Sequence, residues 1–122
     1  MSNNLTHMIA VIFEAIPAEG KWEEYLDMAS TLRPLLGEID GFISVERFQS
    51  LTQPEKVLSL SFWRDEESVR QWRNVEVHRM AQKAGREKIF DDYRIRVASV
   101  VRDYGLSERQ EAPGDSREWT SE

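Results

Sequence analysis

The chain has 122 residues, no cysteine, and 22 acidic against 16 basic residues, which gives a net charge of −6. This length predicts one domain, and the lack of cysteine excludes disulfides, thiolate nucleophiles and cysteine-bound metals. The negative charge argues against a nucleic-acid partner, which needs clustered lysine and arginine. Apolar runs are too short to span a membrane and residues 1–7 lack a signal-peptide pattern, so we expect a cytoplasmic protein without a membrane partner.

The first part of the chain predicts a strand followed by a helix. Residues 1–7 are polar and are expected to be a flexible N-terminus. Residues 8–16, MIAVIFEAI, are almost continuously apolar, which is typical of a strand covered on both faces. Over residues 21–36, apolar side chains recur at spacings of three and four, which indicates an amphipathic helix. Gly37 is expected to be the left-handed residue that follows this helix.

The middle of the chain predicts a β-hairpin. Asp40-Gly41 indicates a turn, and residues 42–51 and 56–64 have strand patterns separated by a short connection. Strict alternation along the first of these strands would place Phe42 and Val45 on opposite faces of the sheet.

The last part of the chain predicts a second helix and a final strand. Asp65 is a suitable N-cap, and a helical pattern continues to about Lys88. Residues 91–104 have the pattern of a strand. Residues 105–122 are polar and contain proline and glycine, so we expect a flexible C-terminal tail.

The predicted element order is β-α-β-β-α-β, which is the ferredoxin-like α+β pattern with an antiparallel sheet. We expect one domain over residues 8–104. In this fold the helices cover one face of the sheet and leave the other face bare. An apolar sheet face of that size is not stable in water, so we expect a homodimer that closes two sheets into an α+β barrel.

Several segments resemble one family. They are MIAVIFEAIPAEGKWEEYL at 8–26, GFISVERFQS at 41–50, LSLSFWRDEESVRQW at 58–72, and His-x-x-Ala at 78–81. Together they resemble the antibiotic biosynthesis monooxygenase family over roughly residues 8–104. The resemblance implies a dimeric α+β barrel. It leaves the activity open, because the family includes cofactor-free quinol monooxygenases, haem-degrading enzymes and proteins with no known activity.

The cofactor-free branch of the family implies a pocket between the helices and the sheet. There a deprotonated quinol or phenol passes an electron to O2, without a metal or another cofactor. In this chain Trp72 matches the tryptophan of that pocket, and Asn74 and His78 are its polar neighbours. Gln82, Arg86 and Tyr93 are further candidates for binding the substrate.

The haem-degrading branch fits the sequence less well. The resemblance implies an axial histidine about ten residues after the tryptophan and an asparagine in the first strand. This chain has Gln82 near the former position, and residues 8–16 contain no asparagine. Haem binding therefore ranks third among our functional hypotheses. The second is a dimeric domain that binds a small aromatic ligand without turnover.

His78 is the natural candidate for a base, because an unperturbed histidine titrates near pH 6.5. On an unbroken helix, however, a six-residue separation leaves Trp72 and His78 about 120° apart. They converge on one pocket only if the helix breaks between them, and Arg73-Asn74 is the expected break. A surface role for His78 and a core role for Trp72 are the structural alternatives. His7 and His78 alone make a catalytic metal a weak hypothesis.

Overall fold

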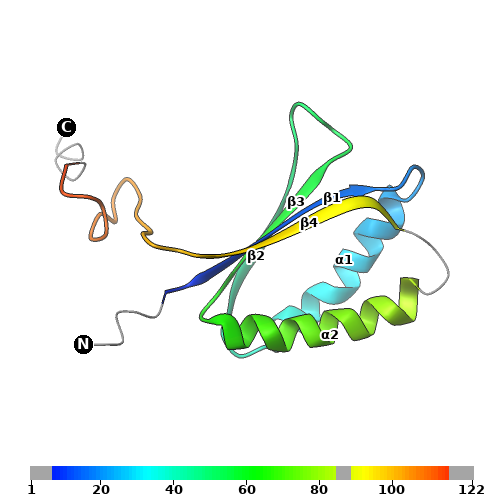
Figure 1. The fold of residues 1–122 in the computed structure, drawn as a ribbon, viewed down its shortest axis with the longest axis horizontal. Helices are drawn as coiled ribbons and strands as arrows, with labels where there is room; N and C mark the ends of the chain where they lie inside the picture. The colour runs from blue at the N-terminus through cyan, green and yellow to red at the C-terminus, as the bar shows by residue number, and fades with distance from the viewer. Residues whose placement is uncertain (1–6, 85–88, 116–122) are drawn as a thin grey trace.

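The computed structural model describes residues 7–84 and 89–115, with side chains described outside 77–84. Within these residues, strands and helices follow the predicted order (Figure 1). Their bounds are β1 (Ile9–Pro17), α1 (Trp22–Leu36), β2 (Phe42–Gln49), β3 (Val57–Trp63), α2 (Glu66–Ala84) and β4 (Phe90–Ser99). The predicted ferredoxin-like α+β fold is confirmed.

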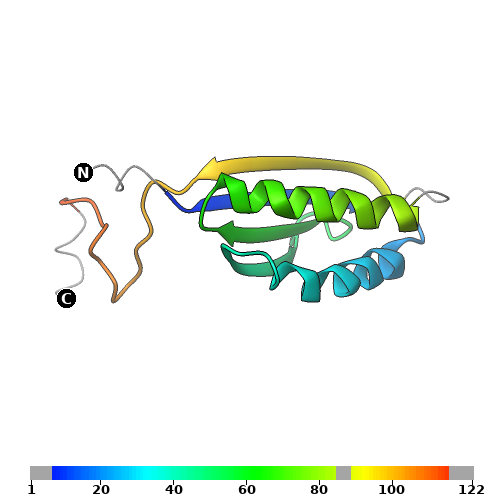
Figure 2. The same ribbon diagram turned by 90° about the horizontal axis from the view of Figure 1, so that it is seen from below.

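The strands form one antiparallel sheet in the order β2-β3-β1-β4. Both helices lie on the same side of this sheet, and in the part of the chain that is described no helix covers the opposite side (Figures 1 and 2). The second view also shows β4 at the edge of the sheet, beyond α2. The molecule therefore has a helix-facing side and an open side.

The core lies between the helices and the sheet in two adjoining clusters. The first includes Tyr25 of α1 and Ala15 of β1, and the second is built around Trp63 of β3, which is completely buried. Trp72 of α2 packs against both clusters. This layer positions the aromatic side chains that the sequence singled out.

The alternation predicted for the second strand is wrong at its start. The register shifts between Phe42 and Ser44, and Phe42 lies opposite Trp63 while Val45 lies opposite Ser61. Trp63 and Ser61 are two residues apart and share a face. The irregularity therefore brings Phe42 to the helix-facing side, where its ring meets that of Trp63 edge-on at 5.3 Å.

The turn after α1 also differs from expectation. Gly37 has φ −66°, not the predicted left-handed conformation, because Glu38 and Ile39 continue the chain with tight backbone turns onto Leu35 and Leu36. The positive φ occurs instead at Gly41, with φ 98°. A Cβ at Gly41 would collide with the side chain of Ser68, so this turn needs a glycine.

The last strand is shorter than predicted. β4 ends at Ser99, which pairs with Ile9 at the beginning of β1, and the backbone N–H of Val100 donates to Met8 at 2.8 Å. Beyond this point β1 offers no further partner. Residues 100–115 lead away from the sheet without helix or strand (Figure 1). The flexibility predicted for 105–122 remains a prediction.

Candidate functional site

The inner face of α2 is the starting point of the site. Asp65 caps the helix as predicted, because its Oδ1 accepts hydrogen bonds from the backbone N–H of Ser68 at 2.9 Å and from its hydroxyl at 2.8 Å. From this fixed start, Val69, Trp72 and Glu76 follow at spacings of three and four residues, which places them on one face. Val69 is buried, and Trp72 and Glu76 are half-buried.

Trp72 lies at the centre of this layer. Its ring stacks on that of Trp63 with centroids 6.3 Å apart and an interplanar angle of 28°. The indole N–H of Trp63 is satisfied by the hydroxyl of Ser61 at 2.9 Å. Among the described residues, the N–H of the half-buried Trp72 has no such partner. Trp72 is therefore both a core residue and a candidate pocket residue.

Glu76 was missed in the sequence analysis. It lies one turn after Trp72, only about 40° away around the helix. No hydrogen bond or ion pair to its carboxyl is found in the described part of the chain, and burial raises its pKa above the usual value for glutamate. The sequence signal was available, because Glu76 continues the spacing of Val69 and Trp72. A titratable group with a raised pKa beside aromatic side chains is suited to proton transfer.

The helix-facing side of the sheet has a polar end and an apolar end. One row across the four strands consists of Arg47, Ser59, Phe13 and Ile95, as the register places them opposite one another. Arg47 and Ser59 supply hydrogen-bond donors, whereas Phe13 and Ile95 are apolar. This row can thus receive a molecule with one polar end and one apolar part.

Among the described residues, the partner of Arg47 is a phenol and not a carboxylate. Its Nε is shielded from solvent and has no hydrogen-bond partner among the described residues. Burial raises the pKa of the nearby Tyr25, while the charge of Arg47 and a hydrogen bond from its guanidinium partly offset this rise. The two side chains form a cationic, donor-rich group under α1.

An aromatic group joins this polar end to the last strand. The ring of Phe90 lies 5.9 Å from that of Tyr25 and 5.6 Å from that of Phe13, centroid to centroid. Tyr93 lies 5.7 Å from Phe13 and 5.9 Å from Phe90, and it is 58% exposed. Tyr93 therefore reaches the same layer from its open edge, and its role in binding substrate stays a prediction.

The predicted helix break is wrong. α2 continues from Glu66 through Ala84 without interruption, because the intrahelical pattern tolerates Asn74 on an exposed face. Asn74 is exposed and lies about 200° around the helix from Trp72. The backbone places His78 about 120° from Trp72. The structure thus brings Glu76, rather than Asn74, next to Trp72.

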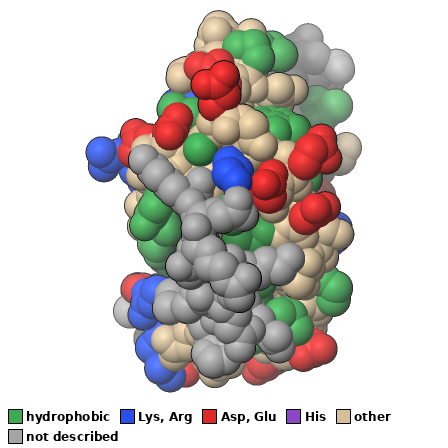
Figure 3. Space-filling view, turned by 90° about the vertical axis from the view of Figure 1, so that its right-hand side faces the viewer, with side chains coloured by type: hydrophobic (Ala, Val, Ile, Leu, Met, Phe, Trp, Pro, Cys, Tyr) green, Lys and Arg blue, Asp and Glu red, His purple; other side chains and the backbone are tan. Residues whose placement is uncertain are grey.

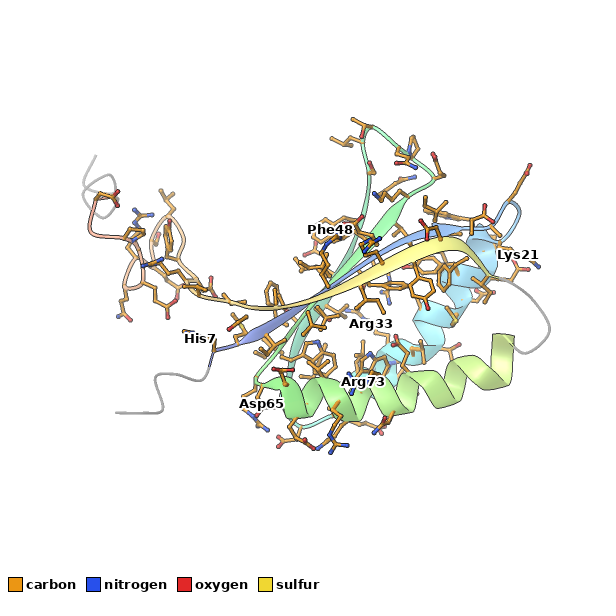
Figure 4. All side chains as sticks on the ribbon, viewed as in Figure 1. His7, Lys21, Arg33, Phe48, Asp65 and Arg73 are labelled. Atoms are coloured by element: carbon orange, nitrogen blue, oxygen red, sulfur yellow. The ribbon has the colours of Figure 1, made fainter. Side chains whose placement is uncertain are left out.

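The structure describes only some of the other predicted site residues. The side chains of His78 and Gln82, and all of Arg86, lie outside the described residues. His7 is exposed at the start of β1 (Figure 4). Across residues 7–84 and 89–115, no group of three His, Cys, Asp or Glu side chains is arranged to hold a metal ion. No helix described there is long and apolar enough to cross a membrane.

Two surface depressions lie away from this layer. One lies within the segment 103–111, and another lies between the end of α1 and the start of β2. Neither includes Trp72, Glu76 or Arg47. Figure 3 views the end of the molecule near the connection from α2 to β4, where acidic side chains gather around the undescribed atoms. The site is therefore defined by its side-chain chemistry in the layer under the helices.

Comparison with known proteins agrees with this architecture. The family model described as "Antibiotic biosynthesis monooxygenase" matches residues 8–84, so the chain belongs to that family. The jasmonate monooxygenase ABM of Pyricularia oryzae is 49% identical over 94 residues, which are 77% of this chain and 44% of that protein. The chain thus spans less than half the length of that relative. The uncharacterized protein YqjZ of Bacillus subtilis is 28% identical over 93 residues, covering 76% of this chain and 79% of that protein.

Solved structures share the fold at low sequence identity. Rv0793 from Mycobacterium tuberculosis has a TM-score of 0.68 at 13% identity, with 80% of this chain and 99% of that chain covered. A conserved protein from Methanosarcina mazei has a TM-score of 0.66 at 21% identity, with 77% and 93% covered. At such identities the likeness concerns the fold alone.

Proposed function

We propose that this chain is a cofactor-independent monooxygenase that acts with O2 on a small aromatic quinol or phenol. Family membership and the name of the Pyricularia relative support a monooxygenase-type activity. The observation that carries the proposal is the position of Trp72, half-buried between two core clusters and one turn from the carboxyl of Glu76, which has no partner among the described residues. An aromatic surface beside a proton acceptor suits a substrate that must lose a phenolic proton.

The reaction needs deprotonation before it needs an oxidant. A base takes the phenolic proton, the O–H electron pair stays on the substrate oxygen, and the electron-rich phenolate passes an electron to O2. For a phenol with a free para C–H, the overall reaction of one phenol and one O2 gives one para-quinone and one water. The protein then has to bind the anion, exclude water and hold the proton.

Two residues of α2 compete for the role of base. His78 is the sequence candidate, as a base or as an orienting group. Asn74, which the sequence also suggested as a hydrogen-bond donor to the substrate or to an oxygen intermediate, is exposed on another face of α2 than Trp72. Glu76 is the structural candidate, because it shares the inner face with Trp72. Gln82, Arg86 and Tyr93 are proposed to contact the substrate, and Tyr93 is supported by its place beside Phe13.

A second substrate class is favoured by the Pyricularia relative. That protein is named for jasmonate, and its identity with this chain is 49%. We therefore propose a jasmonate-like acid with an apolar ring as the alternative to a quinol. A molecule of this kind also matches a row that is polar at Arg47 and apolar at Phe13 and Ile95.

We further propose a homodimer formed through the open side of the sheet. That side carries Ile12, Leu60 and Phe62, and also Phe48, which is 43% exposed and is seen on the side away from the helices in Figure 4. Burial of these side chains against a second copy would be favourable. Sedimentation velocity should show a dimer for the wild type and a monomer for Leu60→Lys. A monomeric wild type at high concentration would rule out this assembly.

The function is tested by O2 uptake with metal-stripped protein and a panel of hydroquinones, dihydroxynaphthalenes and jasmonate. The variants are Trp72→Phe, His78→Ala and Glu76→Gln, with Arg70→Met as a surface control. We expect substrate-dependent uptake that falls in Trp72→Phe and in whichever of the other two removes the base, typically by about 100-fold or more. Uptake at the autoxidation background across the panel would reject the oxygenase and favour ligand binding without turnover. A Soret band on haem titration would favour the third hypothesis.

A further inference from the structure

Arg47 carries a positive charge that no acidic side chain neutralises within the described residues. The contrast with other arginines is clear: Arg64, Arg70 and Arg96 each lie within 3.1 Å of a carboxylate oxygen. Those three are exposed, whereas Arg47 is half-buried with its Nε shielded from solvent and unpartnered. Among the described residues, Arg47 thus combines partial burial with the lack of a carboxylate partner.

An arrangement of this kind is costly for folding alone. A guanidinium removed from water loses hydration, and only an anion with good hydrogen-bond geometry restores that loss. Tyr25 accepts a hydrogen bond from Arg47 but contributes no negative charge as a neutral phenol. Ser59, opposite Arg47 on β3, adds a hydroxyl donor on the same side of the sheet. The position is thus equipped for an anion from outside the chain.

The register also indicates what should be attached to that anion. Next to Ser59 in the same row come Phe13 and then Ile95. The rings of Phe90 and Tyr93 lie against Phe13. A ligand with its charged group at Arg47 would therefore place its remaining atoms over an apolar, aromatic surface.

We propose that Arg47, with Tyr25 and Ser59 beside it, binds the carboxylate of an acidic substrate whose ring lies over Phe13. The inference rests on the proposed function in taking this ligand as the molecule that is oxidised. A carboxylate fits because its two oxygens match two parallel N–H donors of one guanidinium. A phosphate would call for additional cations, which the described residues of this row do not provide.

The probe is 1,4-dihydroxy-2-naphthoate, compared with its neutral 2-carboxamide. Binding is measured by calorimetry without oxygen at pH 7.5, so that no turnover interferes. We expect the wild type to bind the acid more tightly than the amide by about tenfold to a hundredfold, as is typical of a charge-assisted hydrogen bond. Arg47→Met should abolish this preference, and the exposed control Arg70→Met should retain it. Equal binding of acid and amide by the wild type, or no binding of the acid, would overturn the proposal.

The stability of the same variants separates ligand binding from a structural role. Replacing an unpaired, half-buried cation by an apolar side chain of similar length should leave Tm unchanged or raise it. If Arg47 instead supports the fold, Arg47→Met should lower Tm and weaken both ligands equally, which contradicts the proposal. Arg47→Lys provides a second variant that keeps the charge. It should retain part of the acid preference, because a lysine lacks the planar fork.

Oxygen uptake distinguishes this inference from the proposed activity. Acid-selective binding without O2 uptake would leave the Arg47 site in place and reject the monooxygenase. Uptake with identical KM values for acid and amide would retain the monooxygenase and reject the Arg47 site.

Discussion

The two sides of the sheet differ in how their charged side chains are paired. On the open side, Glu14 lies 3.0 Å from the Lys56 ammonium and 2.8 Å from the Arg96 guanidinium. In the layer between helices and sheet, neither Arg47 nor Glu76 has an ion-pair partner among the described residues. Glu14 is thus held by two cations, whereas Arg47 and Glu76 have no counter-charge among the described residues.

This difference separates structural from functional roles. Pairing on the open side costs little, and exposed pairs of this kind contribute little to stability. Unpaired charges under the helices lower stability, and folding alone would favour apolar replacements. The presence of these charged groups beside Trp72 and Phe13 is explained if a bound ligand supplies the missing partner. The helix-facing layer therefore binds substrate in our proposals, while the open side is left for assembly.

The largest expected effect on stability comes from Trp63→Ala, which we compare with the same change at its neighbour Phe62 on the opposite face of β3. Trp63→Ala should lower the free energy of unfolding by about 3–5 kcal/mol, because Trp63 is completely buried between the sheet and the helices. Phe62 faces the open side, opposite Ala10. Phe62→Ala should cost less in the isolated chain and should instead weaken self-association. Urea denaturation at several protein concentrations measures both the free energy of unfolding and the contribution of self-association.

The two faces of β3 would not differ in the way we propose if Phe62→Ala destabilised the protein as much as Trp63→Ala at every protein concentration. In that case the open side would be covered within a single chain, and the dimer proposal would lose its support.

A smaller effect is expected for Glu76→Gln. Because burial raises the folded-state pKa of Glu76, its stabilising contribution is fully present below the unfolded pKa, about 4.3, and is lost as pH rises through the folded pKa. The variant should therefore match the wild type in acid and become more stable above the raised pKa. We expect a gain of about 1 kcal/mol at neutral pH, the usual size of a single-substitution effect.

Urea denaturation over a series of pH values measures this difference. Glu66→Gln is the matched control, since Glu66 is exposed in the first turn of the same helix. A Glu76→Gln variant that is less stable than the wild type at neutral pH would show that the carboxylate has a stabilising partner, and would contradict this prediction.

The fold could be predicted from the sequence because the signals that define its elements are local. Periodicity and turn residues define the elements, and the capping role of Asp65 follows from its place before a helical pattern. Arg47 and Glu76 were missed for a different reason. Each is a polar residue at a core-facing position, and pattern analysis treats polarity as exposure. Recognising Arg47 as part of a site also requires the opposing residues Ser59 and Phe13, which only the register of the sheet provides.

Prediction of the helix break failed because it was inferred from function. Convergence of Trp72 and His78 required a break, and Asn74 offered a suitable residue. The unbroken helix shows that local capping potential does not interrupt a helix whose inner face, here Val69 and Trp72, is held by the core.

The smallest expected effect is that of Glu14→Gln, and its sign is opposite to that of Glu76→Gln. The hydrogen bond from Lys56, followed by the charges of Lys56 and Arg96, lowers the pKa of Glu14. Its contribution is therefore present above the unfolded pKa and is lost as pH falls through the folded pKa. Glu14→Gln should be slightly less stable than the wild type at neutral pH and equal to it in acid. Glu46→Gln, an exposed neighbour on the open side, is the control in the same pH series. If Glu14→Gln and Glu76→Gln changed stability in the same direction at neutral pH, the contrast between paired and unpaired charges on the two sides of the sheet would be wrong.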